Sequence, residues 1–405
     1  MAVAVFTWGF GKYGQLGTGQ GQNAEVPQLI KLPVGTTPIK ISCGAHFTSV
    51  LCQVSKKGAE KVKTKIFTCG WGKYGRLGTG SEDNKPVLTE VLLPDGCDDL
   101  LDVSSGHWHA CCVAQDGGVF SWGYNGSHGV LGTIFDDVQA ATKSPPMFSV
   151  MPLRVVVPMG TKFNRVSCGY NFTYAISEDG QCFSWGCGKH GVLGHGDTSD
   201  RLHPCLLEII KGKQFTQIGC GYSHVALVEA SGELYMVGSG KDGALGHRGD
   251  KQDRHSPSRV DALSGVQISN ASCSQGEHHA HTLACTLEGE VFSWGDGYKG
   301  KLGHGNQESC DVPTIIDLKH FQNERVILVS CGGIHSAALT DKGHMFTWGC
   351  GSDGRLGHPE AKGHRYLFRS DFPRIVEGIP PKSGKVVAIS CSYYHSGALC
   401  SSIAS

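Results

Sequence analysis

Short apolar runs alternate with glycine-rich turns along the whole chain. In residues 326–358 the runs VILVSC, HSAALT and MFTWG contain β-branched, aromatic and small residues, and the intervening letters include DKG and GSDG. Runs of this length between turn dipeptides favour β-strands joined by hairpins. No segment keeps a helical periodicity over three turns. The pattern therefore predicts an all-β protein.

Two interleaved motifs recur seven times each. The first runs from the glycine of WG, or of a variant of WG, to the glycine of LG. Its glycine pairs are Gly9/Gly17, Gly70/Gly78, Gly123/Gly132, Gly186/Gly194, Gly238/Gly246, Gly295/Gly303 and Gly349/Gly357. The second motif is built around SCG, from ISCGAHF to ISCSYYH. A period of 52 to 63 residues, held along the chain, predicts a repeat architecture.

One repeat has room for about four short strands, the usual size of a propeller blade. A single small sheet buries too little apolar surface to be stable alone, so we expect the blades to pack face to face in a ring. The chain starts with the WG half of a repeat and finishes with the SCG half. We therefore expect the first and last strands to pair in one blade, which removes exposed sheet edges. Residues 1–405 are expected to form a single domain.

The repeated apolar residues are predicted to build the scaffold. The leucine of each LG should fill the gap between neighbouring blades: Leu16, Leu77, Leu131, Leu193, Leu245, Leu302 and Leu356. The SCG position should hold a small buried side chain: Cys43, Ser105, Cys168, Cys220, Cys273, Cys331 and Cys391.

These repeats resemble those of the regulator of chromosome condensation family, usually called RCC1-like. The resemblance covers the full chain and rests on both motifs recurring seven times in register. It implies an all-β fold: a seven-bladed β-propeller of RCC1 type, with four-stranded blades and a ring closed by pairing of the N- and C-terminal strands. Departures from the family pattern are Cys69 and Val237 in place of tryptophan, and Phe47 and Phe172 in place of histidine.

The charge balance limits the expected partners. The chain has 36 basic and 36 acidic side chains, whereas a nucleic-acid binder normally carries a basic patch or tail. The lysine-rich run from Ser55 to Lys65 is expected to be a solvated hairpin tip.

No apolar run reaches the length of a membrane span, and the strand pattern that begins at residue 3 predicts no secretory leader. Eighteen cysteines favour free thiols in cytosol or nucleus, and we expect a monomer that binds neither membrane nor chromatin directly.

The sequence predicts no catalytic residue, cofactor or metal. Cysteine and histidine recur four apart, as in Cys220/His224 and Cys331/His335, but once per blade and therefore spread around the ring. We expect these histidines to be buried and hydrogen-bonded within their own blades. Nucleophile-elbow, zinc-protease and phosphate-loop motifs are absent from the sequence.

The loop residues that follow SCG are the predicted partner-binding face. The resemblance implies that these positions lie on one face and touch the partner in family members. In this chain they are rich in aromatic and histidine side chains, which provide stiff contact area at binding hot spots. The candidate partner-binding residues are His46, His107, Trp108, Tyr170, Asn171, Tyr222, Glu277, His278, Tyr393 and Tyr394.

Two functions remain open at this stage. The favoured one is a non-catalytic interaction scaffold or regulatory adaptor that binds a protein partner through its loop face. The alternative, implied by the resemblance, is guanine-nucleotide exchange on a small GTPase of the Ran, Rab or Arf type. The third repeat has one extra residue and offers a candidate wedge: Tyr124, Asn125, Ser127, His128, Asp136 and Asp137.

The partner-face loops argue against exchange activity, because the exchange proteins of the family carry acidic residues there and only Glu277 comes close in this chain. The plant ultraviolet photoreceptor of the family repeats G-W-R-H-T and stacks tryptophans at an arginine-rich face. Only Trp108 is expected near that position here, so we do not expect a photoreceptor.

Overall fold

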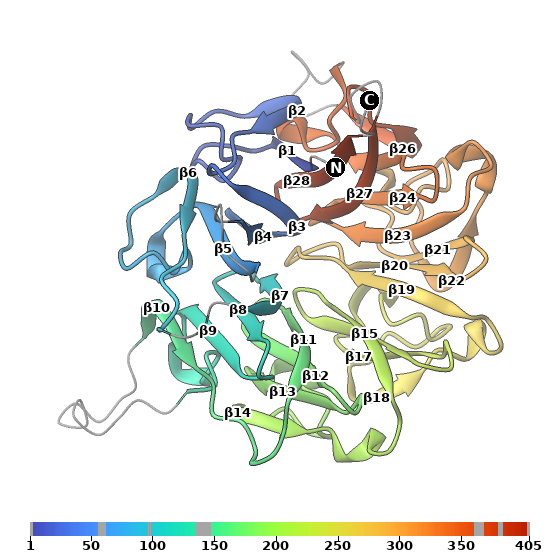
Figure 1. Ribbon diagram of the computed structural model, residues 1–405. Coiled ribbons are helices and arrows are strands. Elements are labelled where there is room, and N and C mark those ends of the chain that lie inside the picture. The colour runs from blue at the N-terminus through green and yellow to red at the C-terminus, as the bar shows by residue number, and fades with distance from the viewer. Residues whose placement is uncertain are drawn as a thin grey trace.

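The computed structural model describes residues 3–55, 62–95, 97, 99–133, 147–359, 368–379 and 384–402. In this part of the chain, seven four-stranded antiparallel sheets are arranged as blades around a central axis (Figure 1). The sequence-based prediction of a seven-bladed β-propeller is confirmed. Short 3₁₀ turns are the only helical elements among these residues.

Each blade consists of four strands, which are named in order from the axis outwards. Blade 1 contains β27 (Gly384–Cys391), β28 (His395–Ser402), β1 (Val3–Gly9) and β2 (Ala24–Ile30). Blade 2 contains β3 (Thr36–Cys43), β4 (Phe47–Val54), β5 (Lys63–Gly70) and β6 (Lys85–Glu90). Blade 3 contains β7 (Leu100–Ser105), β8 (His109–Ala114), β9 (Val119–Tyr124) and β10 (Phe148–Arg154). Blade 4 contains β11 (Phe163–Cys168), β12 (Phe172–Ser177), β13 (Cys182–Gly186) and β14 (Arg201–Leu206).

The remaining blades repeat the same arrangement. Blade 5 contains β15 (Phe215–Cys220), β16 (His224–Glu229), β17 (Leu234–Gly238) and β18 (Arg254–Arg259). Blade 6 contains β19 (Ile268–Cys273), β20 (His281–Thr286), β21 (Val291–Gly295) and β22 (Cys310–Ile316). Blade 7 contains β23 (Val326–Cys331), β24 (His335–Thr340), β25 (Met345–Cys350) and β26 (Arg369–Ile375). The 3₁₀ turns are η1 (Lys73–Gly75), η2 (Gly126–His128), η4 (Lys189–Gly191), η5 (Glu208–Ile210), η6 (Lys241–Gly243), η7 (Asp261–Leu263), η8 (Tyr298–Gly300), η9 (Leu318–Phe321) and η10 (Ser352–Gly354).

The two ends of the chain close the ring. Strand β1 pairs antiparallel with β28, in a register that runs from Val3 opposite Ser401 to Gly9 opposite His395. Figure 1 shows the N-terminal strand beside β28. The indole Nε1 of Trp8 donates to the carbonyl of Arg355 in blade 7, 3.1 Å away. The predicted pairing of terminal strands is therefore confirmed.

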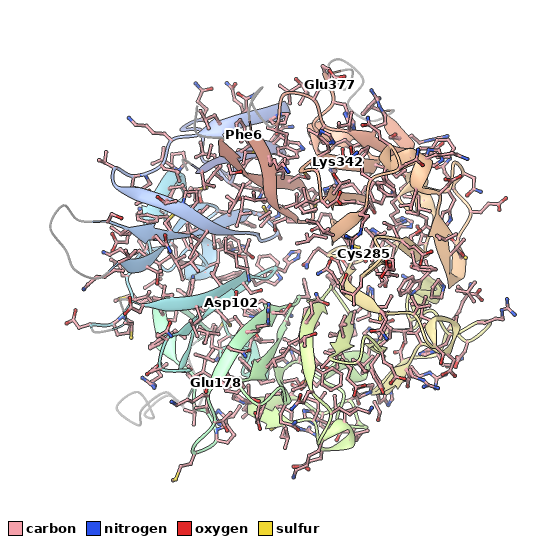
Figure 2. All side chains as sticks on the ribbon, turned by 45° about the vertical axis from the view of Figure 1, so that its right-hand side comes forward. Phe6, Asp102, Glu178, Cys285, Lys342 and Glu377 are labelled. Carbon is pink, nitrogen blue, oxygen red and sulfur yellow. The ribbon has the colours of Figure 1, made fainter. Side chains whose placement is uncertain are left out.

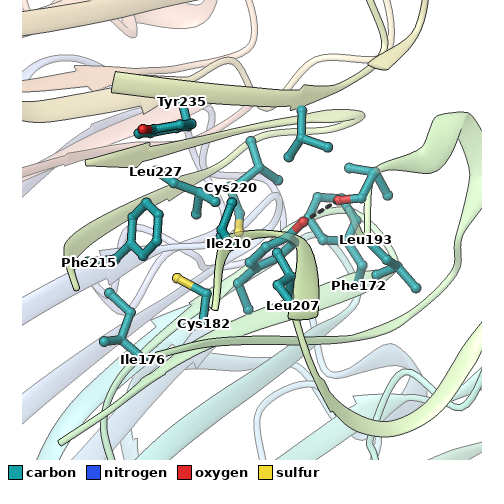
Figure 3. Close-up of a cluster of buried hydrophobic side chains, with 14 residues drawn as sticks. Phe172, Ile176, Cys182, Leu193, Leu207, Ile210, Phe215, Cys220, Leu227 and Tyr235 are labelled. Atoms are coloured by element: carbon teal, nitrogen blue, oxygen red, sulfur yellow. Dashed lines mark hydrogen bonds between the residues drawn. The ribbon is translucent and has the colours of Figure 1, made fainter. Parts of the chain in front are cut away.

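Apolar side chains fill the junctions between blades. Figure 3 shows the junction of blades 4 and 5, where Leu193 and Phe172 pack with Phe215 and Leu227. All seven leucines of the LG motif are at most 1% exposed, as predicted. Burial of one leucine contributes about 1.5–3 kcal/mol, so these repeated contacts are a main stabilising term.

The innermost strands line a narrow axial channel of about 150 Å³. The cysteines and the serine of the SCG position are at most 5% exposed, and all of them except Cys273 line this channel, which confirms their prediction as small buried fillers. Asp102 of β7, labelled in Figure 2, ties three blades together there. Its carboxylate pairs with Lys40 of blade 2 and accepts from the amide of Val166 in blade 4, 3.0 Å away.

The Nε2 atoms of the buried histidines bond to the next blade rather than within their own, so that expectation was wrong for these atoms. Nδ1 of His395 does bond within its own blade, 2.9 Å from Oγ of Ser392. Each Nε2 lies within hydrogen-bond distance of a hydroxyl in the next blade. The pairs are His395–Thr48 (2.8 Å), His109–Thr173 (2.8 Å), His224–Thr282 (3.0 Å), His281–Ser336 (3.0 Å) and His335–Ser396 (2.9 Å). The Thr48 hydroxyl donates its own proton to the carbonyl of Gln15, so Nε2 of His395 is the donor. The sequence could not show that these histidines bond to the next blade. The histidine and the hydroxyl residue occupy positions that recur once per repeat, so a partner in the same blade and one in the next blade both fit the pattern.

Candidate protein-binding face

Loops at one end of the channel carry most of the predicted partner-binding residues. They follow the innermost strands β3, β7, β11, β15 and β27. Main-chain hydrogen bonds join three of these loops to the next blade: the amide of Ala45 donates to the Gly106 carbonyl at 3.3 Å, that of His107 to Gly169 at 3.2 Å, and that of Tyr222 to Ser274 at 2.8 Å. The side chains are therefore held on a stiff, interlocked rim.

We call the aromatic side chains in mutual contact at this end the aromatic face. They come from blades 1 to 5 and make an unbroken series of ring contacts. Its members are Phe10, Tyr13, His46, Trp71, Tyr74, His107, Trp108, Tyr124, Phe148, Tyr170, Tyr222, Tyr393 and Tyr394.

His107 is the centre of the aromatic face. Its ring lies 4.8 Å from Trp108 and 4.8 Å from Tyr170, measured between ring centroids. It also lies 6.1 Å from Tyr393 and 6.4 Å from His46, which belong to blades 1 and 2. Burial, helped by nearby positive charge, lowers the pKa of His107 to about 3. The centre of the face is thus neutral at physiological pH.

A buried cation lies beside this centre. The guanidinium carbon of Arg76 is 4.5 Å from the ring centre of Trp71 and 4.5 Å from that of Trp108. Its Nε donates to the Lys73 carbonyl at 2.9 Å and its Nη1 to the His107 carbonyl at 3.2 Å. Burial lowers the pKa of Arg76 to about 9.

Arg76 lacks the counter-ion that the two other basic residues at this repeat position have. Arg355 pairs with Asp353 at 3.2 Å, and Lys301 pairs with Asp296. Among the described residues, no acidic side chain forms an ion pair with Arg76, and its Nη2 makes no hydrogen bond. The two tryptophan rings are therefore its main electrostatic support.

The other predicted partner-binding residues lie at the border of the aromatic face. Asn171 is half-buried, and its main-chain carbonyl accepts from the Cys187 amide at 2.9 Å. Glu277 and His278 are exposed on blade 6. Burial raises the pKa of Tyr222 and of Tyr393, and the negative charge of Glu277 adds to both shifts in pKa. Blade 7 offers the half-buried Ile334 at the equivalent position. This side of the rim is more polar.

The candidate wedge residues do not form one surface. Tyr124 joins the aromatic face, with its ring 5.1 Å from Tyr74. The side chain of Asn125 is buried and accepts from the Leu131 amide at 3.0 Å. Ser127 is exposed, and His128 bonds to Asp200 of blade 4 at 2.7 Å. Asp136 and Asp137 lie outside the described residues, as do residues 56–61 of the lysine-rich hairpin.

Sequence reasoning missed several members of the aromatic face. Phe10, Tyr13, Trp71 and Tyr74 belong to the WG-to-LG motif, as does Arg76, which contacts the face, and none of them is among the residues predicted to bind a partner. The expectation that only Trp108 lies in this region was wrong, because Trp71 lies 6.1 Å from it. A signal was present: the residue after WG is aromatic in the first three repeats and small or polar in the others.

Two groups of metal-ligating side chains occur in the described part of the chain. His109, Cys111 and Cys168 are fully buried between blades 3 and 4. His128, Cys187 and Asp200 are partly exposed near the rim of the same two blades. Neither group was expected from the Cys/His spacing, because both combine residues from different blades. Within the described segments, no helix has the length and apolar character needed to span a bilayer.

Comparison with known proteins agrees with the repeat pattern. The model of the RCC1-like domain matches residues 4–398. The chain is 32% identical over 375 residues to the ultraviolet-B receptor UVR8 of Arabidopsis thaliana, which covers 93% of this chain and 78% of the receptor. It is 35% identical over 335 residues to the human E3 ubiquitin-protein ligase HERC2, but the match spans only 6% of that ligase.

Solved structures show the same fold. Human WBSCR16 superposes over the whole of both chains with a TM-score of 0.83 and 25% identity. Prp20p of Saccharomyces cerevisiae, whose structure is described with its binding to Gsp1p and histones, superposes with a TM-score of 0.79 and 18% identity. That match covers 100% of this chain and 92% of Prp20p.

Proposed function

The chain belongs to the RCC1-like family, and we propose that it is a non-catalytic scaffold that binds a protein partner through the aromatic face. The unbroken contact between aromatic side chains from five blades is the observation that carries this proposal. Tyrosine and tryptophan provide large contact area with little loss of side-chain entropy, which is why they dominate binding hot spots.

Rigidity of the rim supports the same proposal. Main-chain hydrogen bonds between blades cross-link several of the loops, and the rings of Trp71 and Trp108 both contact the guanidinium group of Arg76. A surface that is already ordered loses little entropy on binding. Arg76 is fully buried and lacks an acidic partner in the described residues, so its uncompensated positive charge favours a partner whose contacting segment is negatively charged.

The proposal is tested by quantitative affinity purification of the full chain from its native cells. Trp108→Ala combined with Tyr394→Ala should remove the specific partner, because both side chains are half-buried members of the aromatic face. Phe372→Ala is the matched control, since Phe372 is an aromatic residue 42% exposed on the outer strand β26. A partner set that is unchanged by the double substitution but altered by Phe372→Ala would place the interface elsewhere.

Exchange activity can be separated from simple binding in the same material. Release of labelled GDP from GTPases of the Ran, Rab and Arf types is measured with and without the chain. The scaffold proposal expects no acceleration above the spontaneous rate. Acceleration that is lost in the Tyr124→Ala variant would instead favour an exchange factor that uses the third repeat.

A further inference from the structure

The junction between blades 3 and 4 brings together three side chains that the sequence keeps far apart. His128 comes from η2 of blade 3, whereas Cys187 and Asp200 come from the turns that flank η4 of blade 4. The ligand atoms of all three lie within 4.8 Å of one another, and Nδ1 of His128 is 2.7 Å from Oδ2 of Asp200. Two ligand atoms on one tetrahedral zinc ion are roughly 3.5 Å apart, so the cluster has the right size.

Main-chain contacts hold these three residues in place. The amide of Gly188 donates to Oδ1 of Asp200 at 2.8 Å, which leaves Oδ2 directed to His128. The amide of Cys187 donates to the Asn171 carbonyl at 2.9 Å. Gly129 has a φ of 67°, and a Cβ there would lie 2.7 Å from the Cα of Leu202. Glycine therefore allows η2 to approach blade 4 closely enough for His128 to reach Asp200.

The cluster opens onto a pocket of about 660 Å³ that it helps to line, together with Tyr170 and Tyr222. His128 and Asp200 are each more than a third exposed at the side chain, so an ion and a fourth ligand have access. Three protein ligands with one open position are the usual arrangement of a zinc site that accepts water or another group.

The next blade junction provides an internal comparison. There His190 bonds to Asp253 at 2.8 Å, and the amide of Gly240 donates to Oδ1 of Asp253 at 3.1 Å, as in the first junction. Ser239 occupies the position equivalent to Cys187. The histidine–aspartate pair is thus a shared structural feature, and the thiol is what distinguishes the junction of blades 3 and 4.

We propose that His128, Cys187 and Asp200 bind one Zn²⁺ ion that clasps blades 3 and 4 beside the aromatic face. Imidazole, thiolate and carboxylate are all zinc ligands, and the thiolate favours zinc over magnesium or calcium. On binding, the Cys187 thiol releases its proton to solvent and the His128–Asp200 hydrogen bond is replaced by two bonds to the metal. The fourth position is open to water or to a side chain of a partner.

Titration of the metal-free full chain with Co²⁺ tests the site, because cobalt bound to a thiolate gives a charge-transfer band in the near ultraviolet. One equivalent should produce the band, and Zn²⁺ should remove it by displacement. Cys187→Ser should abolish the band, whereas Cys111→Ser, in the fully buried group, should leave it unchanged. Far-ultraviolet circular dichroism of each variant verifies that the propeller is intact.

The proposal is overturned if the wild-type chain gives no thiolate band, if Cys187→Ser retains it, or if Cys111→Ser removes it. Ser239→Cys provides a second test, since it builds the missing thiol beside His190 and Asp253. The variant should bind two equivalents of Co²⁺ instead of one. A variant that still binds one would contradict the claim that the thiol is the deciding ligand.

Discussion

Arg76 contacts both Trp71 of blade 2 and Trp108 of blade 3, with its guanidinium carbon 4.5 Å from each ring centre, while the two ring centres are 6.1 Å apart. The planar group also donates to two main-chain carbonyls, those of Lys73 and His107. A lysine has one point charge on a flexible stem and cannot reproduce both the stacking and the two directed hydrogen bonds. We therefore infer that Arg76 holds both tryptophan rings in place.

Arg76→Lys should lower the free energy of unfolding by about 1–3 kcal/mol, because at least one charge-assisted hydrogen bond and the ring contacts are lost. Urea unfolding followed by tryptophan fluorescence measures this change. Arg254→Lys is the matched control, since Arg254 forms an exposed i,i+4 pair with Asp250 and should change stability by less than about 0.5 kcal/mol. Equal effects of the two substitutions would show that Arg76 has no special role.

Stability should depend on pH through the buried histidines. Burial lowers the pKa of His224 to about 4 and, together with nearby positive charge, that of His395 to about 3. The unfolded chain binds these protons near pH 6.5, before the folded chain does, so this stability is complete above pH 6.5 and falls as the pH drops towards 4. Each histidine contributes up to about 1.4 kcal/mol per pH unit in that window.

Urea unfolding at pH 7.5, 6 and 5 measures this slope. His224→Gln should reduce the slope, because glutamine keeps a donor near Thr282 but does not titrate. His255→Gln should leave it unchanged, since His255 is exposed. A slope that is the same in all three proteins would exclude His224 as a source of the pH dependence.

Closure of the ring can be tested at Trp8, which is 0% exposed and bonds to the Arg355 carbonyl of blade 7. Trp8→Ala should cost about 3–5 kcal/mol in the free energy of unfolding, because it leaves a cavity at the closing junction. Leu29→Ala on the neighbouring strand β2 serves as the control, since Leu29 is 63% exposed. Thermal and urea unfolding of both variants give the comparison; a small effect at Trp8 would mean that the ring is not stabilised by this closure.

The fold could be predicted from sequence because seven copies of two motifs fix the strand pattern, the blade number and the pairing of the ends. The loop aromatics were also predictable, because they occupy two positions, two and three places after the SCG cysteine, at which the repeats differ from one another. The contacts between blades could not be predicted from the sequence. Which blade His335 reaches, or that His128 meets Asp200, depends on how neighbouring sheets dock, and residues about 60–70 apart carry no local signal of it.

Partner-face residues within the WG-to-LG motif could also not be identified from a single repeat. Trp71 and Arg76 belong to the WG-to-LG motif of the second repeat, where only Leu77 has a predicted role, yet Trp71 is part of the aromatic face and Arg76 contacts it. The turns of the WG-to-LG motif pack between blades and also form part of the rim. The same motif position can therefore be structural in one blade and part of the binding surface in another. Comparing the repeats with one another at those turns would have identified the first three blades as distinct.

The central claim is that the partner covers the aromatic face, and hydrogen–deuterium exchange of the full chain with and without its purified partner tests it directly. Protection is predicted in the amides of the loops at 44–46, 106–108, 169–171, 221–223 and 392–394, with little change in the outer strands β6, β10, β14 and β18. Protection confined to the outer strands, with the five loops unchanged, would contradict the account.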